Sequence, residues 1–138
     1  MKQHLDTLLT EGVNLAISFL DKNGEFFPFA IVLTNHGEIR HVQAGMNEEQ
    51  PTSDDVISFL QNGLRESINE GGYCSIAIVS DVKLRDRDTG DENDAIRVDI
   101  EDQASSPITC YVPYLFSEGI LETKDVISVA GKSFVFRI

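Results

Sequence analysis

The first periodic feature of the chain is a set of apolar side chains that recur every three or four residues. Its members are Leu5, Leu8, Leu9, Val13, Ala16, Phe19 and Leu20. This spacing places them on one face of an α-helix. Asn23-Gly24 follows, and both residue types tolerate the left-handed backbone of a helix end. The pattern therefore predicts an amphipathic helix that ends at this dipeptide.

A second amphipathic helix is predicted after Pro51. Thr52 and Asp55 have the spacing of a capping box, with Asp in place of the usual Glu. The apolar stripe of this helix consists of Val56, Ile57, Phe59, Leu60, Leu64 and Ile68. Gly71-Gly72 predicts its end.

The segments between and after the helices are rich in β-branched and aromatic residues, which predicts strands. In segment 26–34 both alternating sets of side chains are apolar. This indicates burial on two sides, or one side against the core and the other against a partner. A turn at residues 35–37 leads into a more polar strand. Later strands are expected at 73–84, 94–102 and 108–115, with one or two short strands within 126–138.

The long hairpin after the second helix permits a prediction of register. We place Ile76 and Ile96 on the same buried face of the sheet. Only those registers are therefore allowed in which the apolar residues of both strands share this face. The register that avoids like charges then sets Asp81 opposite Arg97, unless a bulge intervenes.

These elements predict an α+β fold in a single domain spanning residues 1–138. Short connections between successive strands require antiparallel pairing, so we expect a sheet of about five strands with two long helices. The order helix, strand, strand, helix and three strands resembles the profilin-like and roadblock-like arrangement. This resemblance concerns topology alone, and one topology hosts many functions.

The charge balance restricts the classes of partner. The chain of 138 residues has 11 Lys and Arg against 23 Asp and Glu, a net charge of −12. This argues against nucleic acid and against an anionic membrane surface, because both require a broad basic face. An acidic surface instead suits a solvated protein or one with a basic partner.

The ends and the cysteines point to the cytoplasm. Charged residues interrupt the first apolar run, so we expect no signal peptide. The longest strongly apolar stretch, 26–33, is too short to span a bilayer. Cys74 and Cys110 have no metal-binding spacing and are expected to be buried thiols, with a disulfide or a reactive thiol as the alternative.

No motif in the sequence identifies catalytic, cofactor-binding or metal-binding residues. Gly131-Lys132-Ser133 resembles the end of a phosphate-binding loop, but the earlier glycine and the following helix are missing. An acidic hairpin loop contains Asp86, Asp88, Asp91, Glu92 and Asp94. Its glycine lies at the wrong position for an EF-hand, which favours a solvated loop over irregular calcium binding.

Two aromatic groups are candidates for an interaction surface: Phe26, Phe27 and Phe29 in the first strand, and Tyr111, Tyr114 and Phe116 in a later strand. Aromatic residues also dominate cores, so core packing is the competing interpretation. The sequence therefore favours a non-catalytic binding or protein-interaction domain, with a protein partner or a second copy in a homodimer. The alternative is a small enzyme whose pocket uses a carboxylate or a histidine.

Overall fold

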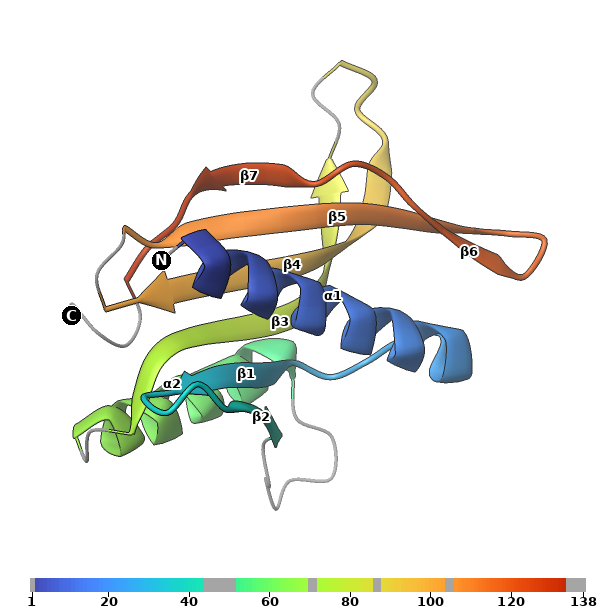
Figure 1. Ribbon diagram of the computed structural model, residues 1–138. Helices are drawn as coiled ribbons and strands as arrows, with labels where there is room; N and C mark the ends of the chain where they lie inside the picture. The colour runs from blue at the N-terminus through green and yellow to red at the C-terminus, as the bar shows by residue number, and fades with distance from the viewer. Residues whose placement is uncertain (1, 44–51, 70–71, 86–87, 104–105, 134–138) are drawn as a thin grey trace.

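The computed structural model describes residues 2–43, 52–69, 72–85, 88–103 and 106–133 (Figure 1). It contains two helices and seven strands. In chain order they are α1 (Lys2–Asn23), β1 (Phe29–Thr34), β2 (Ile39–Gln43), α2 (Ser53–Asn69), β3 (Tyr73–Arg85), β4 (Glu92–Asp102), β5 (Ile108–Ser117), β6 (Ile120–Thr123) and β7 (Ile127–Ala130). The predicted α+β class and both predicted helices are confirmed.

All seven strands form one antiparallel sheet in the order β2-β1-β3-β4-β5-β6, and β7 also pairs with β5. The expected number of about five strands was therefore too low. Strand β7 falls in the terminal segment where short strands were expected, whereas β6 was not predicted. With only four residues each, these strands carry little periodic signal.

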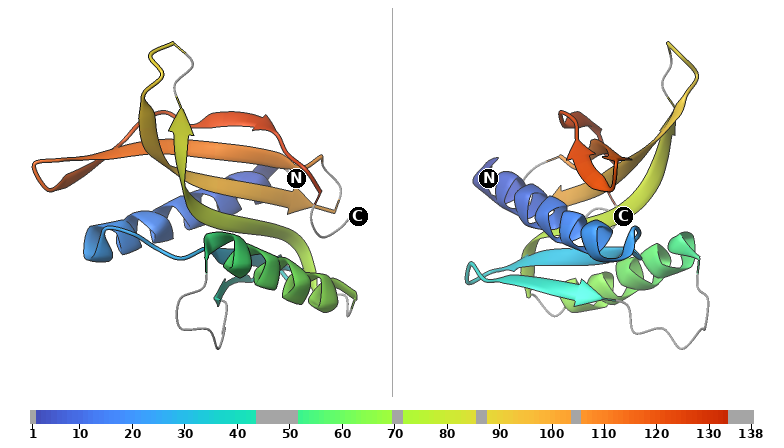
Figure 2. Two further views of the ribbon diagram at one scale, coloured as in Figure 1. Left: turned by 180° about the vertical axis from the view of Figure 1, so that it is seen from behind. Right: turned by 90° about the vertical axis from the view of Figure 1, so that its right-hand side faces the viewer.

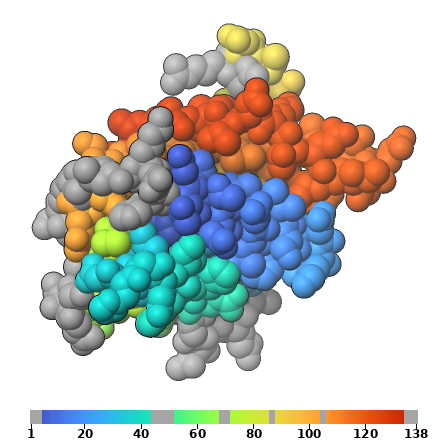
Figure 3. All heavy atoms as spheres, viewed as in Figure 1, coloured from blue at the N-terminus to red at the C-terminus, as the bar shows by residue number. Residues whose placement is uncertain are grey.

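Helix α1 covers one face of the sheet, and in the space-filling view it lies between the β1–β2 and β5–β6 hairpins (Figure 3). Its buried residues pack on β1, β3, β4 and β5; the shared core includes Leu8, Ala16, Leu20, Ile31, Ala77, Val79, Ile96, Val98 and Val112. The approach is close at Gly12. A Cβ atom built there would lie 2.9 Å from Cγ2 of Val79.

Helix α2 covers part of the opposite face. It packs on β1 and β3 through a second cluster that contains Ala30, Val32, Val56, Leu60, Leu64, Ile76 and Ile78. All six residues of β1 are consequently buried, which confirms two-sided burial within this chain for residues 29–34, whereas Phe27 of the same predicted segment is 63% exposed. The capping box is also confirmed, because the Asp55 amide donates to Thr52 Oγ1 at 3.1 Å and the Thr52 amide to Asp55 Oδ2 at 3.3 Å.

The predicted register of the long hairpin was wrong. Asp81 lies opposite Ile96, and Arg97 lies opposite Ser80. The prediction assumed one buried face, but β3 is buried on both. Val79, rather than Ile78, therefore shares the α1 face with the apolar residues of β4.

Neither helix is apolar enough over sufficient length to cross a lipid bilayer, as far as the described residues show.

Candidate functional site

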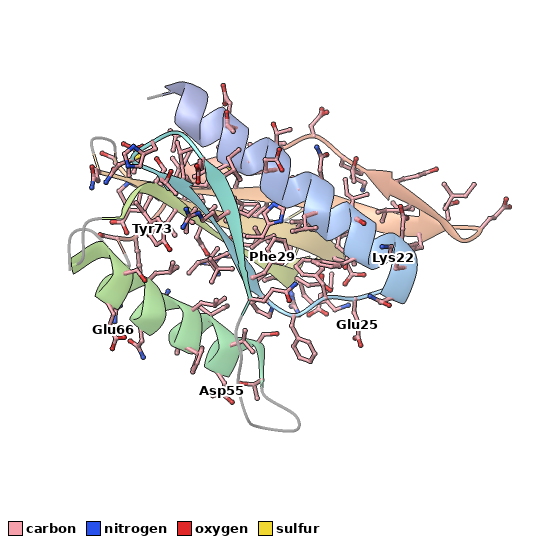
Figure 4. All side chains as sticks on the ribbon, turned by 60° about the horizontal axis from the view of Figure 1, so that its bottom comes forward. Lys22, Glu25, Phe29, Asp55, Glu66 and Tyr73 are labelled. Atoms are coloured by element: carbon pink, nitrogen blue, oxygen red, sulfur yellow. The ribbon has the colours of Figure 1, made fainter. Side chains whose placement is uncertain are left out.

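A solvent-open cleft of about 720 Å³ lies where the segment 24–28 connects α1 to β1. Its walls come from five elements and this connection. They include Phe19 and Asn23 of α1, Glu25 to Phe29, Gln43 of β2, Ser53 and Val56 of α2, and Asp81 of β3. In Figure 4, Phe29 lies between the two helices, with Glu25 and Asp55 at the same end of the molecule. The cleft thus lies where β1 begins and β2 ends, next to the part of β3 that continues past them.

The local sequence explains why neither α1 nor β1 extends into the segment beside the cleft. Gly24 ends α1 with a φ of 77° and donates its amide hydrogen to Leu20 O at 2.8 Å. Pro28 cannot donate to a strand ladder, and it stands immediately before β1. Of the three residues between them, Glu25 and Phe27 lie on the exposed rim of the cleft, whereas Phe26 packs against the core.

Three phenylalanine rings form an aromatic wall. The Phe19 ring meets Phe29 nearly edge to face, with centroids 5.6 Å apart and an interplanar angle of 78°. Phe26 lies 6.5 Å from Phe19 and 5.7 Å from Phe29 between ring centroids. Phe29 is only 2% exposed, whereas Phe27 on the rim is 63% exposed. The wall is thus anchored in the core and ends in a ring that faces water.

Asp81 is the acidic side chain on the sheet side of the cleft. Tyr114, which is 5% exposed, donates its hydroxyl hydrogen to Asp81 Oδ1 at 2.6 Å. Partial burial raises the pKa of Asp81 above 3.8, and this outweighs the opposing effect of the tyrosine hydrogen bond. Burial, and then the same hydrogen bond, raise the pKa of Tyr114 far above its usual range. The carboxylate of Asp81 is therefore poorly solvated, and it accepts a hydrogen bond from one neutral donor, the hydroxyl of Tyr114.

The charged groups around the cleft are mostly acidic. Glu25 and Asp81 are its acidic lining residues, and none of the described residues that line it is Lys, Arg or His. Glu25 is close enough to Asp81 to add to the rise in its pKa. The base nearest to Asp81 along the strand, Lys83, binds Asp94 at 2.6 Å. The cleft therefore combines an aromatic wall and uncharged polar residues with a negative potential.

The structure brings together one of the two predicted aromatic groups completely and part of the other. Phe26, Phe27 and Phe29 all line the cleft. Tyr114 joins it through Asp81, and Phe116 contacts Tyr114 with ring centroids 6.1 Å apart. Tyr111 lies apart, because it pairs with Arg97 on the face opposite α1.

The sequence analysis missed Phe19, Glu25 and Asp81 as residues of a site. Phe19 was assigned to the apolar face of its helix, and Asp81 was considered as the cross-strand partner of Arg97. A signal for Asp81 was present, because it continues the alternation of Ala77 and Val79 into the α1 face. Recognising that signal required knowing that β3 is buried on both sides.

Two acidic residues of the hairpin loop, Glu92 and Asp94, form ion pairs with bases on β3. Lys83 binds Asp94 at 2.6 Å, and Arg85 binds Glu92 at 3.4 Å. Asp88 and Asp91 lie near the turn, and Asp86 lies outside the described residues. Within the described ranges no three His, Cys, Asp or Glu side chains are placed to hold a metal ion.

The remaining candidates for chemistry lie away from the cleft. His41, an exposed residue of β2, lies 3.9 Å from Glu11. Cys110 is a buried free thiol and Cys74 a half-buried one. Gly131 follows β7, and a Cβ atom there would lie 2.9 Å from the carbonyl carbon of Ile108, so the backbone packs closely on β5.

A second exposed surface is the part of the sheet that α2 leaves uncovered, over β4, β5 and β7 (Figure 2, left). Leu115, Ile127 and Val129 are 37%, 49% and 46% exposed there. Tyr111 lies beside them, with the Arg97 guanidinium carbon 6.0 Å from its ring centroid. This surface, defined by these five residues, is called the open sheet face below.

Comparisons of the chain with protein-family models, curated proteins and solved structures give no significant match, so its function is inferred from the geometry of these surfaces.

Proposed function

We propose that the protein is a non-catalytic binding domain. We further propose that the cleft beside Phe19, Phe26 and Phe29, called the aromatic cleft below, holds a segment of a partner protein. The observation that carries this proposal is the pairing of an aromatic wall, anchored by the buried Phe29, with an exposed phenylalanine at the rim. Aromatic side chains of this kind are the usual anchors of protein interfaces. An exposed ring that gains a partner's apolar surface loses unfavourable contact with water.

The shape of the cleft also supports a peptide segment as its occupant. A volume of about 720 Å³ exceeds one side chain, and the cleft is open to solvent rather than enclosed. Its floor is Phe29, which the core holds in place. A preformed floor lowers the ordering cost of binding on the side of this protein.

Selection from a random heptapeptide library displayed on phage tests the proposal. Wild-type protein is expected to select peptides that Phe27→Ser no longer binds. Phe59→Ser is the matched control, because Phe59 is 48% exposed on α2 and does not line the cleft. Selection of no peptide above background, or equal binding by both variants, would refute the proposal.

A small enzyme is the second candidate function, and Asp81 is the observation that favours it. Half-buried carboxylates with a raised pKa are frequent at catalytic sites. Hydrolysis of p-nitrophenyl acetate, phosphate and β-glucoside by wild type and by Asp81→Asn separates the two functions. A rate above background that Asp81→Asn abolishes would replace the binding proposal with the enzymatic one.

We also propose that the protein associates with a second copy of itself. We further propose that it is located in the cytoplasm and does not bind nucleic acid. The open sheet face is the surface that suits a second copy, because the apolar side chains of Leu115, Ile127 and Val129 are exposed there and a two-fold axis would place them against each other. Sedimentation velocity is expected to show a dimer that Ile127→Lys dissociates. A monomer at all concentrations would remove self-association from the proposal.

A further inference from the structure

We propose that the occupant of the aromatic cleft is an arginine side chain of the partner segment, whose guanidinium group binds the carboxylates of Asp81 and Glu25. This inference rests on the proposed function and names the chemistry of its ligand. The inference places the positive charge of the ligand in a cleft that is lined by aromatic rings, by the uncharged polar residues Asn23, Gln43 and Ser53, and by two carboxylates.

Charge complementarity is the first argument. Glu25 and Asp81 come from different elements, the α1–β1 connection and β3, yet both line the cleft. Asp54 and Asp55 in the first turn of α2 follow the lining residue Ser53 and add to the negative potential. Lys22, in the last turn of α1, is the cation nearest in sequence to Glu25, but its side chain does not line the cleft. An incoming cation would therefore meet an excess of acidic groups.

The unused hydrogen-bonding capacity of Asp81 is the second argument. An ionised carboxylate accepts about four hydrogen bonds. Among the described residues Tyr114 is the only donor to it, through Oδ1. Lys83 is occupied by Asp94. The other oxygen of Asp81 is thus available to a ligand that donates N–H groups.

The electrostatic state of Asp81 points in the same direction. Burial raises its pKa, and the negative charges of Asp94 on β4 and of Glu25 raise it further, while Tyr114 on β5 and Lys83 on β3 lower it. A bound cation would reverse the net effect, because it stabilises the ionised carboxylate. The free cleft therefore holds a charge that binding would stabilise.

The exposed ring of Phe27 favours a guanidinium over an ammonium group. A guanidinium is flat, is less strongly hydrated, stacks on aromatic rings and can donate two parallel hydrogen bonds to one carboxylate. A lysine ammonium offers a point charge and keeps more of its water. The cleft offers both the aromatic ring and the carboxylates that an arginine side chain uses.

Two capped peptides test the inference: acetyl-Phe-Arg-Phe-amide and its citrulline counterpart, which has the same shape without the charge. Each is titrated into ¹⁵N-labelled full-length protein and followed by NMR. The arginine peptide is expected to shift the amide signals of Phe27 and Asp81, with a Kd at least tenfold below that of the citrulline peptide. Its affinity should rise as pH increases through the pKa of Asp81, whereas citrulline binding should not change.

Variants separate the local charge from the net charge. Asp81→Asn is expected to remove the tenfold preference for arginine. Asp91→Asn, on the exposed hairpin, changes the net charge equally and should retain the preference. Equal binding of the two peptides in the cleft would overturn this inference and leave the proposed function intact. Binding of neither peptide would also overturn it, while the library selection decides the proposed function independently.

Discussion

Replacing Gly12 by alanine is expected to destabilise the protein, although alanine is the better helix former. The added methyl would lie 2.9 Å from Val79 Cγ2 and 3.7 Å from Ile31 Cδ1. Val79 and Ile31 are fully buried, and a valine side chain at the centre of a sheet has few rotamers to retreat into. Overpacking of this kind costs about 1–3 kcal/mol. Helix propensity offsets about 1 kcal/mol of that cost.

Gly63→Ala provides the matched comparison. Gly63 is also a helix-interior glycine, in α2, but nothing lies within 4 Å of a Cβ atom built there. This variant should gain about 1 kcal/mol from helix propensity alone. The two free energies of unfolding, measured by urea denaturation, should therefore differ by about 1–3 kcal/mol, which is the overpacking cost. An equal gain in stability for both variants would refute the close packing of α1 on β3.

Three further predictions concern single side chains. Ser80→Ala should raise the free energy of unfolding by about 1 kcal/mol in urea titrations, because the buried Ser80 hydroxyl has no hydrogen-bond partner among the described residues. Phe29→Ala should lower it by about 3–5 kcal/mol, since a buried ring is lost from the aromatic wall. Asp81→Asn should be more stable than wild type at pH 7 but not below pH 3.8, as pH-dependent denaturation would show.

The sign of the last prediction follows from the raised pKa of Asp81. The folded protein binds the Asp81 proton more tightly than the unfolded chain, whose pKa is near 3.8. Wild type therefore loses stability as pH rises from 3.8 through the folded-state pKa, and asparagine does not titrate. A stability difference that does not change over this window would contradict the assigned environment. For Phe29→Ala the control is Phe27→Ala, expected within about 0.5 kcal/mol of wild type because this ring is exposed.

Local patterns were sufficient to predict the helices, the first hairpin and the capping box. The helix stripes and the Thr52–Asp55 spacing depend on residues three or four apart, which the helix brings together by itself. The number of strands and the register of β3 with β4 could not be obtained in this way. They depend on which face each helix covers, a contact between segments far apart in sequence.

In the cleft, too, residues close in sequence could be grouped correctly, whereas residues distant in sequence could not. Phe26, Phe27 and Phe29 stand close together in sequence, and they were correctly grouped as one candidate surface. Asp81 reaches them only because β1 and β3 are neighbours in the sheet. Tyr111 and Tyr114 were grouped by proximity in the chain, yet an odd step along a strand sends them to opposite faces.

The pairing of β1 with β3 has a consequence for how the chain folds. Strands β3, β4 and β5 follow one another through short turns, whereas β2 and α2 separate β1 from β3 in the chain. Closing that longer loop costs more entropy, so the three-stranded meander should be protected from hydrogen exchange before β1 is. Until β1 docks, β3 has an unpaired edge with apolar side chains on both faces. That edge is where two chains folding at high concentration would pair wrongly, which makes the rate of β1 docking decisive for the yield of native protein.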